Sequence, residues 1–283
     1  MRVTRATIVG LAITALCTCA TGAASARTSH VVVRVDPVLA ARVDEARALS
    51  AAPLLPTDRA PRVVIAGDSV AATLVIPLIA EAAARGISVL RSVRPGCGML
   101  RGEPTTLDGY TPPWASACDG AAAEWRDEVA GMPADVVLLL STWDGAPRLL
   151  DGVFVDPRTP EGRATTADLF REVVDAIAPV GSGRTVVLLG EAIPTDGDYT
   201  GVASPARVAE ARRHLSVLRM VARADPARVR LVDLDRWLCP RGAPCPTRVA
   251  GIVPRPEDGG HFSVEGAAWL APRLLDKLGL TAR

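Results

Sequence analysis

Two short segments near opposite ends of the chain carry the residue types best suited to acyl-group chemistry. Ser69 follows a glycine and an aspartate at the end of an apolar run, and His261 lies three residues after Asp258 in a glycine-rich loop. Such a carboxylate can accept a hydrogen bond from one imidazole nitrogen, which leaves the other nitrogen facing outward as a base. The pattern predicts Ser69 as a nucleophile, His261 as its base and Asp258 as the carboxylate that orients the imidazole.

Each segment also has a purely structural interpretation. Asp258 can shape a turn while Ser263 caps the helix that follows, and Asp68 or Ser69 can serve as an ordinary helix N-cap. No G-x-S-x-G sequence occurs, but the order Ser, Asp, His along the chain is that of hydrolase folds. At a junction between a strand and a helix, backbone N–H groups of the first helical turn can also bind a developing oxyanion.

The elements that must bring these segments together alternate along the chain. Apolar runs predict five strands, over Arg62–Ala66, Ile87–Val93, Asp135–Leu140, Arg184–Leu189 and Val229–Val232. Helical patterns cover Val70–Ala84, Ala121–Val129, Thr165–Ala178, Pro205–Ala224 and Val264–Leu278. The alternation indicates βαβ units and hence an α/β fold, a three-layer sandwich with a parallel sheet of about five strands. Its site is expected beyond the carboxyl ends of the strands.

Composition and charge exclude some classes of function. The 283 residues are 49% hydrophobic and 22% charged, as in a globular domain with a continuous core. Lys and Arg total 32 against 31 Asp and Glu, so the chain lacks the basic field that nucleic acid binding requires. We therefore expect no nucleic acid partner.

The N-terminal residues are typical of an export signal. Residues 1–26 combine two early arginines, an apolar run and an Ala-Ser-Ala cleavage site, although an uncleaved anchor is the alternative. Residues 27–60 form an extension with an expected helix over Pro37–Ser50, and residues 61–283 form the α/β domain. The protein is thus expected to be secreted or extracytoplasmic.

Cysteine usage agrees with export. The four cysteines beyond the signal are expected to form two disulfides, each closing a short loop, Cys97 with Cys118 and Cys239 with Cys245. A zinc site is the alternative, but no CxxC pair or histidine cluster accompanies these residues. We therefore expect neither a metal nor another cofactor.

The two opening motifs together resemble the first and last conserved blocks of the SGNH/GDSL hydrolase superfamily. Gly67-Asp68-Ser69 after the first strand and Asp258-x-x-His261 before the last helix carry the resemblance, which spans roughly Arg62–Leu278. It implies the flavodoxin-like SGNH hydrolase fold and the same catalytic roles for Ser69, Asp258 and His261. Further motifs are similar to SGNH domains associated with glycan O-acyltransferases: Pro95-Gly96-Cys97-Gly98, Cys118, Trp125, Trp143-Asp144-Gly145 and Asp258-Gly259-Gly260-His261-Phe262-Ser263.

The resemblance also implies the residues around the nucleophile. The oxyanion hole would be formed by Ser69 with Gly98 or Gly96, of which Gly98 is preferred. Trp143 and Asp144 would bind substrate, although Trp143 can equally be a hydrophobic plug at the edge of the sheet. After the third strand the chain has Ser141-Thr142-Trp143-Asp144, without the asparagine that hydrolases of this superfamily carry there.

The expected function is that of an exported serine esterase or O-acyltransferase. Its substrates would be acyl esters, above all acetyl esters, of cell-envelope glycans or other small esters, with a possible association with the envelope. The missing asparagine motivates an alternative, a noncatalytic glycan-binding or envelope-scaffolding protein with the same fold. The other two histidines are set aside, since His30 lies in the extension and His214 in a polar run expected to form a solvated helix face.

Overall fold

The computed structural model describes residues 60–106, 109–113, 115–195, 204–256 and 258–280. They all belong to the larger of the two units into which the chain divides, 37–283. The expected export signal, the helix over 37–50 and the rest of the extension up to residue 59 lie outside the described residues. The boundary of the domain at residue 61 therefore stays a prediction.

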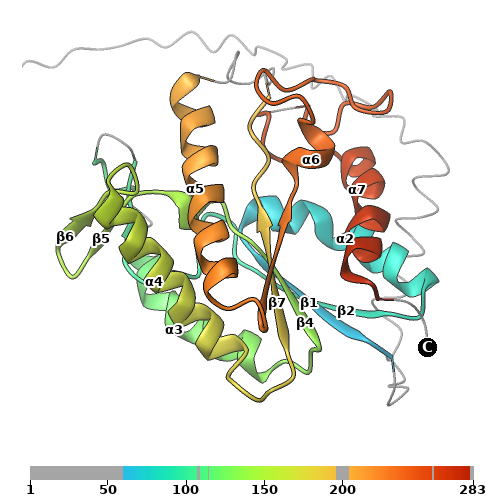
Figure 1. The fold of residues 1–283 in the computed structure, drawn as a ribbon, viewed down its shortest axis with the longest axis horizontal. Helices are drawn as coiled ribbons and strands as arrows, with labels where there is room; N and C mark the ends of the chain where they lie inside the picture. The colour runs from blue at the N-terminus through green and yellow to red at the C-terminus, as the bar shows by residue number, and fades with distance from the viewer. Residues whose placement is uncertain (1–59, 107–108, 114, 196–203, 257, 281–283) are drawn as a thin grey trace, which may run out of the picture. The chain divides into compact units, whose positions relative to one another are not determined.

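A parallel sheet of five strands forms the centre of the molecule (Figure 1). Its strands are β1 (Arg62–Gly67), β2 (Ser88–Val93), β4 (Val136–Leu140), β7 (Thr185–Gly190) and β8 (Val229–Asp233). They lie in the order β2-β1-β4-β7-β8, and each neighbouring pair is parallel. All five residues of β4 are buried, as expected for a strand covered by helices on both faces.

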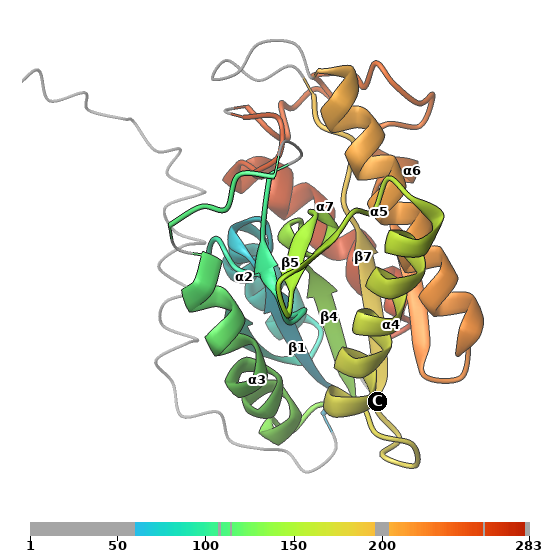
Figure 2. The same cartoon turned by 90° about the vertical axis from the view of Figure 1, so that its left-hand side faces the viewer.

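Helices cover both faces of this sheet (Figures 1 and 2). On one face lie α2 (Ser69–Ala84) and α7 (Val264–Leu278), which pack against each other. On the other face lie α3 (Ala115–Gly131), α4 (Pro160–Ile177) and α5 (Pro205–Ala224). Two separate clusters of buried apolar side chains fill the two interlayer spaces. The predicted three-layer α/β sandwich with five parallel strands is confirmed.

Some predicted bounds differ from those observed. The α3 helix begins at Ala115, six residues before the predicted start, and α4 begins at Pro160 instead of Thr165. For α4 the reason is local, because the Thr159 side chain accepts a hydrogen bond from the N–H of Gly162 and Pro160 occupies the first helical turn.

A second, smaller sheet was not predicted. It consists of β3 (Glu103–Pro104), β5 (Arg148–Leu150) and β6 (Val153–Val155), all antiparallel. Two short helices were also not predicted, η1 (Trp143–Gly145) after β4 and α6 (Asp235–Leu238) after β8. Segments of two to four residues are too short to show a periodic pattern in the sequence.

Two disulfides lie in the described part of the chain, and both have the predicted pairing. Cys97–Cys118 ties the loop after β2 to α3, and Cys239–Cys245 closes the loop after α6. Asp235 lies close to Cys239 and Cys245. The sulfur atoms of these two cysteines are bonded to each other in the disulfide, so they are not available as metal ligands. Among the described residues, no helix has the length and apolar character to span a membrane.

Candidate active site

Ser69 is the first residue of α2 and follows the β1 strand directly. The chain turns at Gly67, the last residue of β1, whose φ of +150° lies outside the range that other residues readily adopt. A Cβ at Gly67 would lie 1.7 Å from the Leu140 carbonyl oxygen. A glycine is therefore required where β1 passes β4 just before the serine.

Asp68 holds this turn in place through both of its carboxylate oxygens. One oxygen caps α2 by accepting a hydrogen bond from the N–H of Val70 at 2.9 Å. The other accepts hydrogen bonds from the N–H and the hydroxyl of Thr142, at 2.6 and 2.7 Å, and from the N–H of Trp143 at 3.2 Å. Burial raises the pKa of Asp68, and these hydrogen bonds oppose that rise. The chain before Ser69 is thus fixed to the loop after β4.

Ser69, His261 and Asp258 lie in one hydrogen-bonded line. The Oγ of Ser69 is 2.8 Å from Nε2 of His261, and Nδ1 of the same ring is 2.6 Å from Oδ2 of Asp258. With the ring proton on Nδ1 facing the carboxylate, Nε2 can accept the serine proton. This arrangement can generate a serine alkoxide beside the helix N-terminus.

The local backbone keeps Asp258 ionised. Its Oδ1 accepts hydrogen bonds from the N–H groups of Gly260 and His261, each at 2.8 Å. Partial burial on its own raises the pKa of Asp258, but the two backbone hydrogen bonds and the His261 ring outweigh burial and lower the pKa to about 2. At neutral pH the carboxylate is charged and fixes the orientation of the imidazole.

The loop that carries Asp258 and His261 is held from two sides. Gly259 has a φ of +72°, accepts a hydrogen bond from the N–H of Thr195 at 3.2 Å, and would place a Cβ 2.1 Å from the Thr195 oxygen. Arg207 of α5 donates to the Asp258 carbonyl at 3.4 Å. Ser263 caps α7 through a 2.9 Å hydrogen bond from Gly266, as the structural interpretation of this segment also required.

The loop after β2 supplies the glycines of the predicted oxyanion hole. It starts beside the nucleophile turn, because the N–H of Arg94 donates to the Gly67 carbonyl at 2.9 Å. Gly96 has a φ of +81° and an open side where a Cβ would meet nothing, whereas a Cβ at Gly98 would lie 1.9 Å from Oδ1 of Asp144. Gly98 is thus the glycine locked in place by the neighbouring loop.

The expected contact between Asp144 and substrate is corrected by the structure. The side chain is fully buried, and its two oxygens accept hydrogen bonds from the N–H groups of Met99 and Leu100, each at 3.0 Å. It also pairs at 3.7 Å with the buried guanidinium of Arg148, which donates to the Leu100 and Arg101 carbonyls. Asp144 therefore holds the loop that contains Gly98 and does not face a substrate.

Trp143, like Thr142 before it, is partly accessible. It is half-buried in the η1 helix at the carboxyl end of β4. The site has no asparagine there, since Thr142 and Trp143 occupy the positions beside the nucleophile turn. Trp143 remains the candidate for substrate contact at this edge of the sheet.

His214 does not lie on a solvated face as expected. It is only 3% exposed, stacks against Phe170 with ring centroids 5.9 Å apart, and contacts η1 closely at Gly145. His214 lies on the buried face of α5 together with Ala211 and Leu215. The sequence prediction gave more weight to the charged residues before His214 than to this helical spacing.

The sequence matches the family model described as the SGNH domain fused to AT3 domains, over residues 40–276. No curated protein matches it. The periplasmic domain of a lipopolysaccharide acetyltransferase from Salmonella ser. Paratyphi A is similar in structure, with a TM-score of 0.53 at 14% identity, over 77% of this chain and 84% of that one. The inhibitor-bound aryl esterase of M. smegmatis also has a TM-score of 0.53 at 14% identity, over 78% of this chain and 100% of that one.

These two structures show the fold alone, because their sequences are so distant. The family match covers most of the chain, including the segments that carry Ser69, Asp258 and His261. The chain belongs to the SGNH domain family and is a serine ester hydrolase or acyltransferase of the SGNH type.

Proposed function

We propose that the protein cleaves or transfers acyl groups of cell-envelope glycan esters through an acyl intermediate on Ser69. The observation that carries this proposal is the continuous line of hydrogen bonds from Ser69 through His261 to Asp258, at 2.8 and 2.6 Å. A serine beside a base that is itself oriented by a carboxylate is the arrangement that acyl transfer requires.

In the first half of the reaction, Ser69 attacks the ester carbonyl carbon while its proton passes to Nε2 of His261. The carbonyl π electrons move onto oxygen, and the N–H groups of Ser69 and Gly98 receive the resulting oxyanion. The tetrahedral intermediate then expels the alcohol, which takes the proton back from His261. The acyl group remains bound to the Ser69 oxygen.

In the second half, His261 removes a proton from water or from a sugar hydroxyl, and that oxygen attacks the acyl carbon. Collapse of the second intermediate releases the acid or the new ester and returns the proton to Ser69. Water gives hydrolysis and a sugar hydroxyl gives transfer. Losing one oxyanion donor typically costs about 10²–10³ in rate. The absence of an asparagine after β4 therefore predicts slow acyl chemistry in both halves of the reaction, with water or with a sugar hydroxyl as the acceptor.

Two features support a glycan of the cell envelope as the substrate. The disulfides Cys97–Cys118 and Cys239–Cys245 are typical of proteins outside the cytoplasm, where envelope glycans lie. The half-buried Trp143, at the carboxyl edge of the sheet, can stack its indole on the C–H face of a sugar ring.

The test is labelling with a fluorophosphonate probe followed by intact-mass analysis. The wild-type chain should gain one probe adduct, and Ser69→Ala should gain none while its circular dichroism and unfolding midpoint stay unchanged. Ser216→Ala is the matched control, because this serine lies in α5, where its hydroxyl donates to the Arg213 carbonyl of the same helix, and its loss should leave labelling intact. An unlabelled wild-type chain would favour the noncatalytic glycan-binding alternative.

A further inference from the structure

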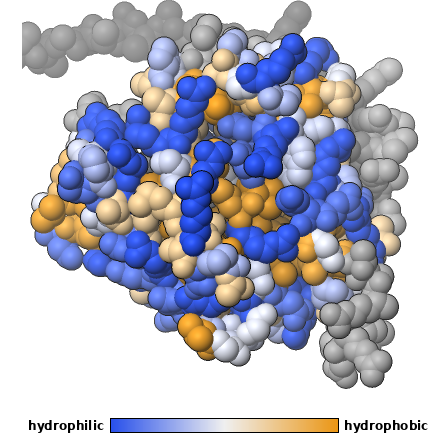
Figure 3. Space-filling model, in the orientation of Figure 1, coloured by the Kyte–Doolittle hydropathy of each residue, from blue (hydrophilic) through white to orange (hydrophobic). Residues whose placement is uncertain are grey.

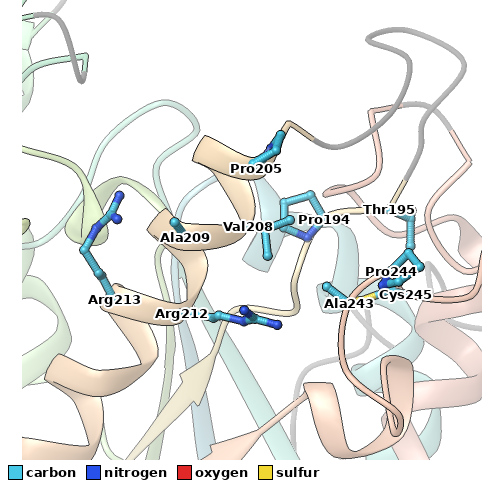
Figure 4. Close-up of a pocket in the computed structure, with 10 residues that line it drawn as sticks. All are labelled: Pro194, Thr195, Pro205, Val208, Ala209, Arg212, Arg213, Ala243, Pro244 and Cys245. Carbon is cyan, nitrogen blue, oxygen red and sulfur yellow. The ribbon is translucent and has the colours of Figure 1, made fainter.

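A cavity lies beside the loop that carries His261, outside the site described above. It has a volume of about 550 Å³ and opens between the first turns of α5, the loop after β7 and the disulfide loop after α6 (Figure 4). Its lining is Pro194, Thr195, Pro205, Val208, Ala209, Arg212, Arg213, Ala243, Pro244 and Cys245. The space is large enough for a sugar unit or a similar small group.

The lining combines an apolar wall with a cation. Most of the lining side chains are apolar, and three of them are prolines. Figure 4 shows the guanidinium of Arg212 extending beneath Val208 toward Ala243, whereas Arg213 points to the other side of α5. No described carboxylate forms an ion pair with Arg212. In Figure 3, hydrophilic side chains gather over α5, with hydrophobic surface showing beside them.

The cavity shares a wall with the loop of the nucleophile's base. Thr195 lines the cavity and donates its N–H to the carbonyl of Gly259 at 3.2 Å. Gly259 lies between Asp258 and His261 in sequence. On the α5 side, Arg207 donates to the Asp258 carbonyl at 3.4 Å. A group bound in the cavity would therefore lie alongside the acyl-transfer site.

We propose that this cavity is a subsite for an anionic group of the substrate glycan, a carboxylate or a phosphate. The guanidinium of Arg212 would bind the anion through two parallel N–H bonds, which suit the planar geometry of a carboxylate or the oxygens of a phosphate. The prolines would pack against the C–H face of the sugar that carries it. The inference rests on the proposed function, because it names the class of glycan that the acyl-transfer site would receive.

Isothermal titration of the full chain with sugars that carry no ester tests the subsite without requiring turnover. The ligands are trigalacturonate for the carboxylate, glucose 6-phosphate for the phosphate and maltotriose as the neutral control. At least one anionic ligand should bind at least about tenfold more tightly than maltotriose, and raising the salt concentration should weaken that binding. The tighter of the two anionic ligands identifies the group that the cavity prefers.

Variants of α5 connect this binding to the cavity. Arg212→Ala and Arg212→Gln should each abolish the tighter binding of the anionic ligand relative to maltotriose. Arg212→Gln does so while it keeps most of the length of the side chain. Arg223→Ala, an exposed arginine in the last turn of the same helix, should leave it unchanged. Equal binding of all three ligands by the wild-type chain, or equal anion affinity in Arg212→Ala, would overturn the subsite.

Catalysis is measured separately so that the two proposals can fail independently. Hydrolysis of p-nitrophenyl acetate, a small neutral ester, should stay unchanged in Arg212→Ala and vanish in Ser69→Ala. If anion binding depends on Arg212 but the chain shows neither esterase activity nor probe labelling, the proposed function is wrong and the anion subsite still stands. Reactivity at Ser69 without anion preference would remove the subsite alone.

Discussion

The hydroxyl of Thr142 donates a 2.7 Å hydrogen bond to the carboxylate of Asp68 and thereby joins the end of β4 to the turn before Ser69. The acceptor is completely buried, so the position of the serine depends on a polar contact that water cannot replace.

Replacing Thr142 with Val should lower both stability and activity. The substitution keeps the shape of the side chain but removes a donor to a buried carboxylate, which typically costs about 1–3 kcal/mol. We expect urea unfolding to show a loss in that range and kcat for p-nitrophenyl acetate to fall. Thr165→Val is the control, since its hydroxyl bonds only to a carbonyl on the exposed side of α4. Equal stability of the two variants would show that the Asp68 contact contributes little.

The ionisation of Asp258 should make stability depend on pH at the acid end. Its pKa of about 2 in the folded protein lies below the ordinary value of 3.8, so the ionised form stabilises the fold above pH 4. That contribution should be lost as the pH falls from about 4 to about 2. In Asp258→Asn it is absent throughout, so the difference in free energy of unfolding between wild type and variant should narrow over this range. A constant difference would contradict the lowered pKa.

Removing Arg148 should be far more damaging than removing its neighbour Arg101. Arg148 is 1% exposed, and its loss would leave Asp144 as a buried charge without its partner, which typically costs about 3–5 kcal/mol. The Arg101 side chain is 40% exposed in its ion pair with Glu172, and such pairs contribute about 1 kcal/mol or less. Thermal and urea unfolding of Arg148→Met and Arg101→Met measure the contrast. Equal losses would mean that the buried pair does not anchor the loop after β2.

Alanine substitutions at Gly98 and Gly96 should show which of the two glycines donates its N–H to the oxyanion. At Gly98 a Cβ would lie 1.9 Å from the Asp144 carboxylate, so the loop must shift and kcat should fall by about 10²-fold or more if its N–H is a donor. At Gly96 the space is open, and the positive φ costs about 1–2 kcal/mol of stability. Steady-state kinetics and urea unfolding of both variants provide the comparison. A larger loss of kcat in Gly96→Ala would move the oxyanion donor to that residue.

The sequence was sufficient to predict the layers of the fold and the segments that meet at the site. The continuous apolar run of β4 and the alternation with long helices leave little choice of architecture. The carboxyl ends of parallel strands share one edge, which makes a meeting of Ser69 with the segment before the last helix plausible from sequence. The motif around His261 predicted the pairing of the acid with the base, because Asp258 and His261 are only three residues apart.

The interior polar contacts could not be predicted in this way. Arg148 and Asp144 are of residue types usually found on surfaces, and nothing in their spacing shows that they bury each other beneath a loop. The burial of His214 was not predicted, because the charged residues that precede it suggested an exposed helix face. The hydrogen bond between the Thr142 hydroxyl and the Asp68 carboxylate joins two residues 74 positions apart. It depends on the approach of β1 and β4, which only the three-dimensional structure reveals.

The contact between Ser69 and His261 spans 192 positions of the chain, from the first helix of the sheet domain to the start of α7. A chain truncated before residue 261 would lack both the imidazole and α7, and it would expose the apolar side of α2 that α7 covers. Ser69 consequently meets its predicted base only in a chain that extends past residue 261 and has packed that segment beside α2. A shorter chain would carry the serine without the imidazole that is proposed to activate it.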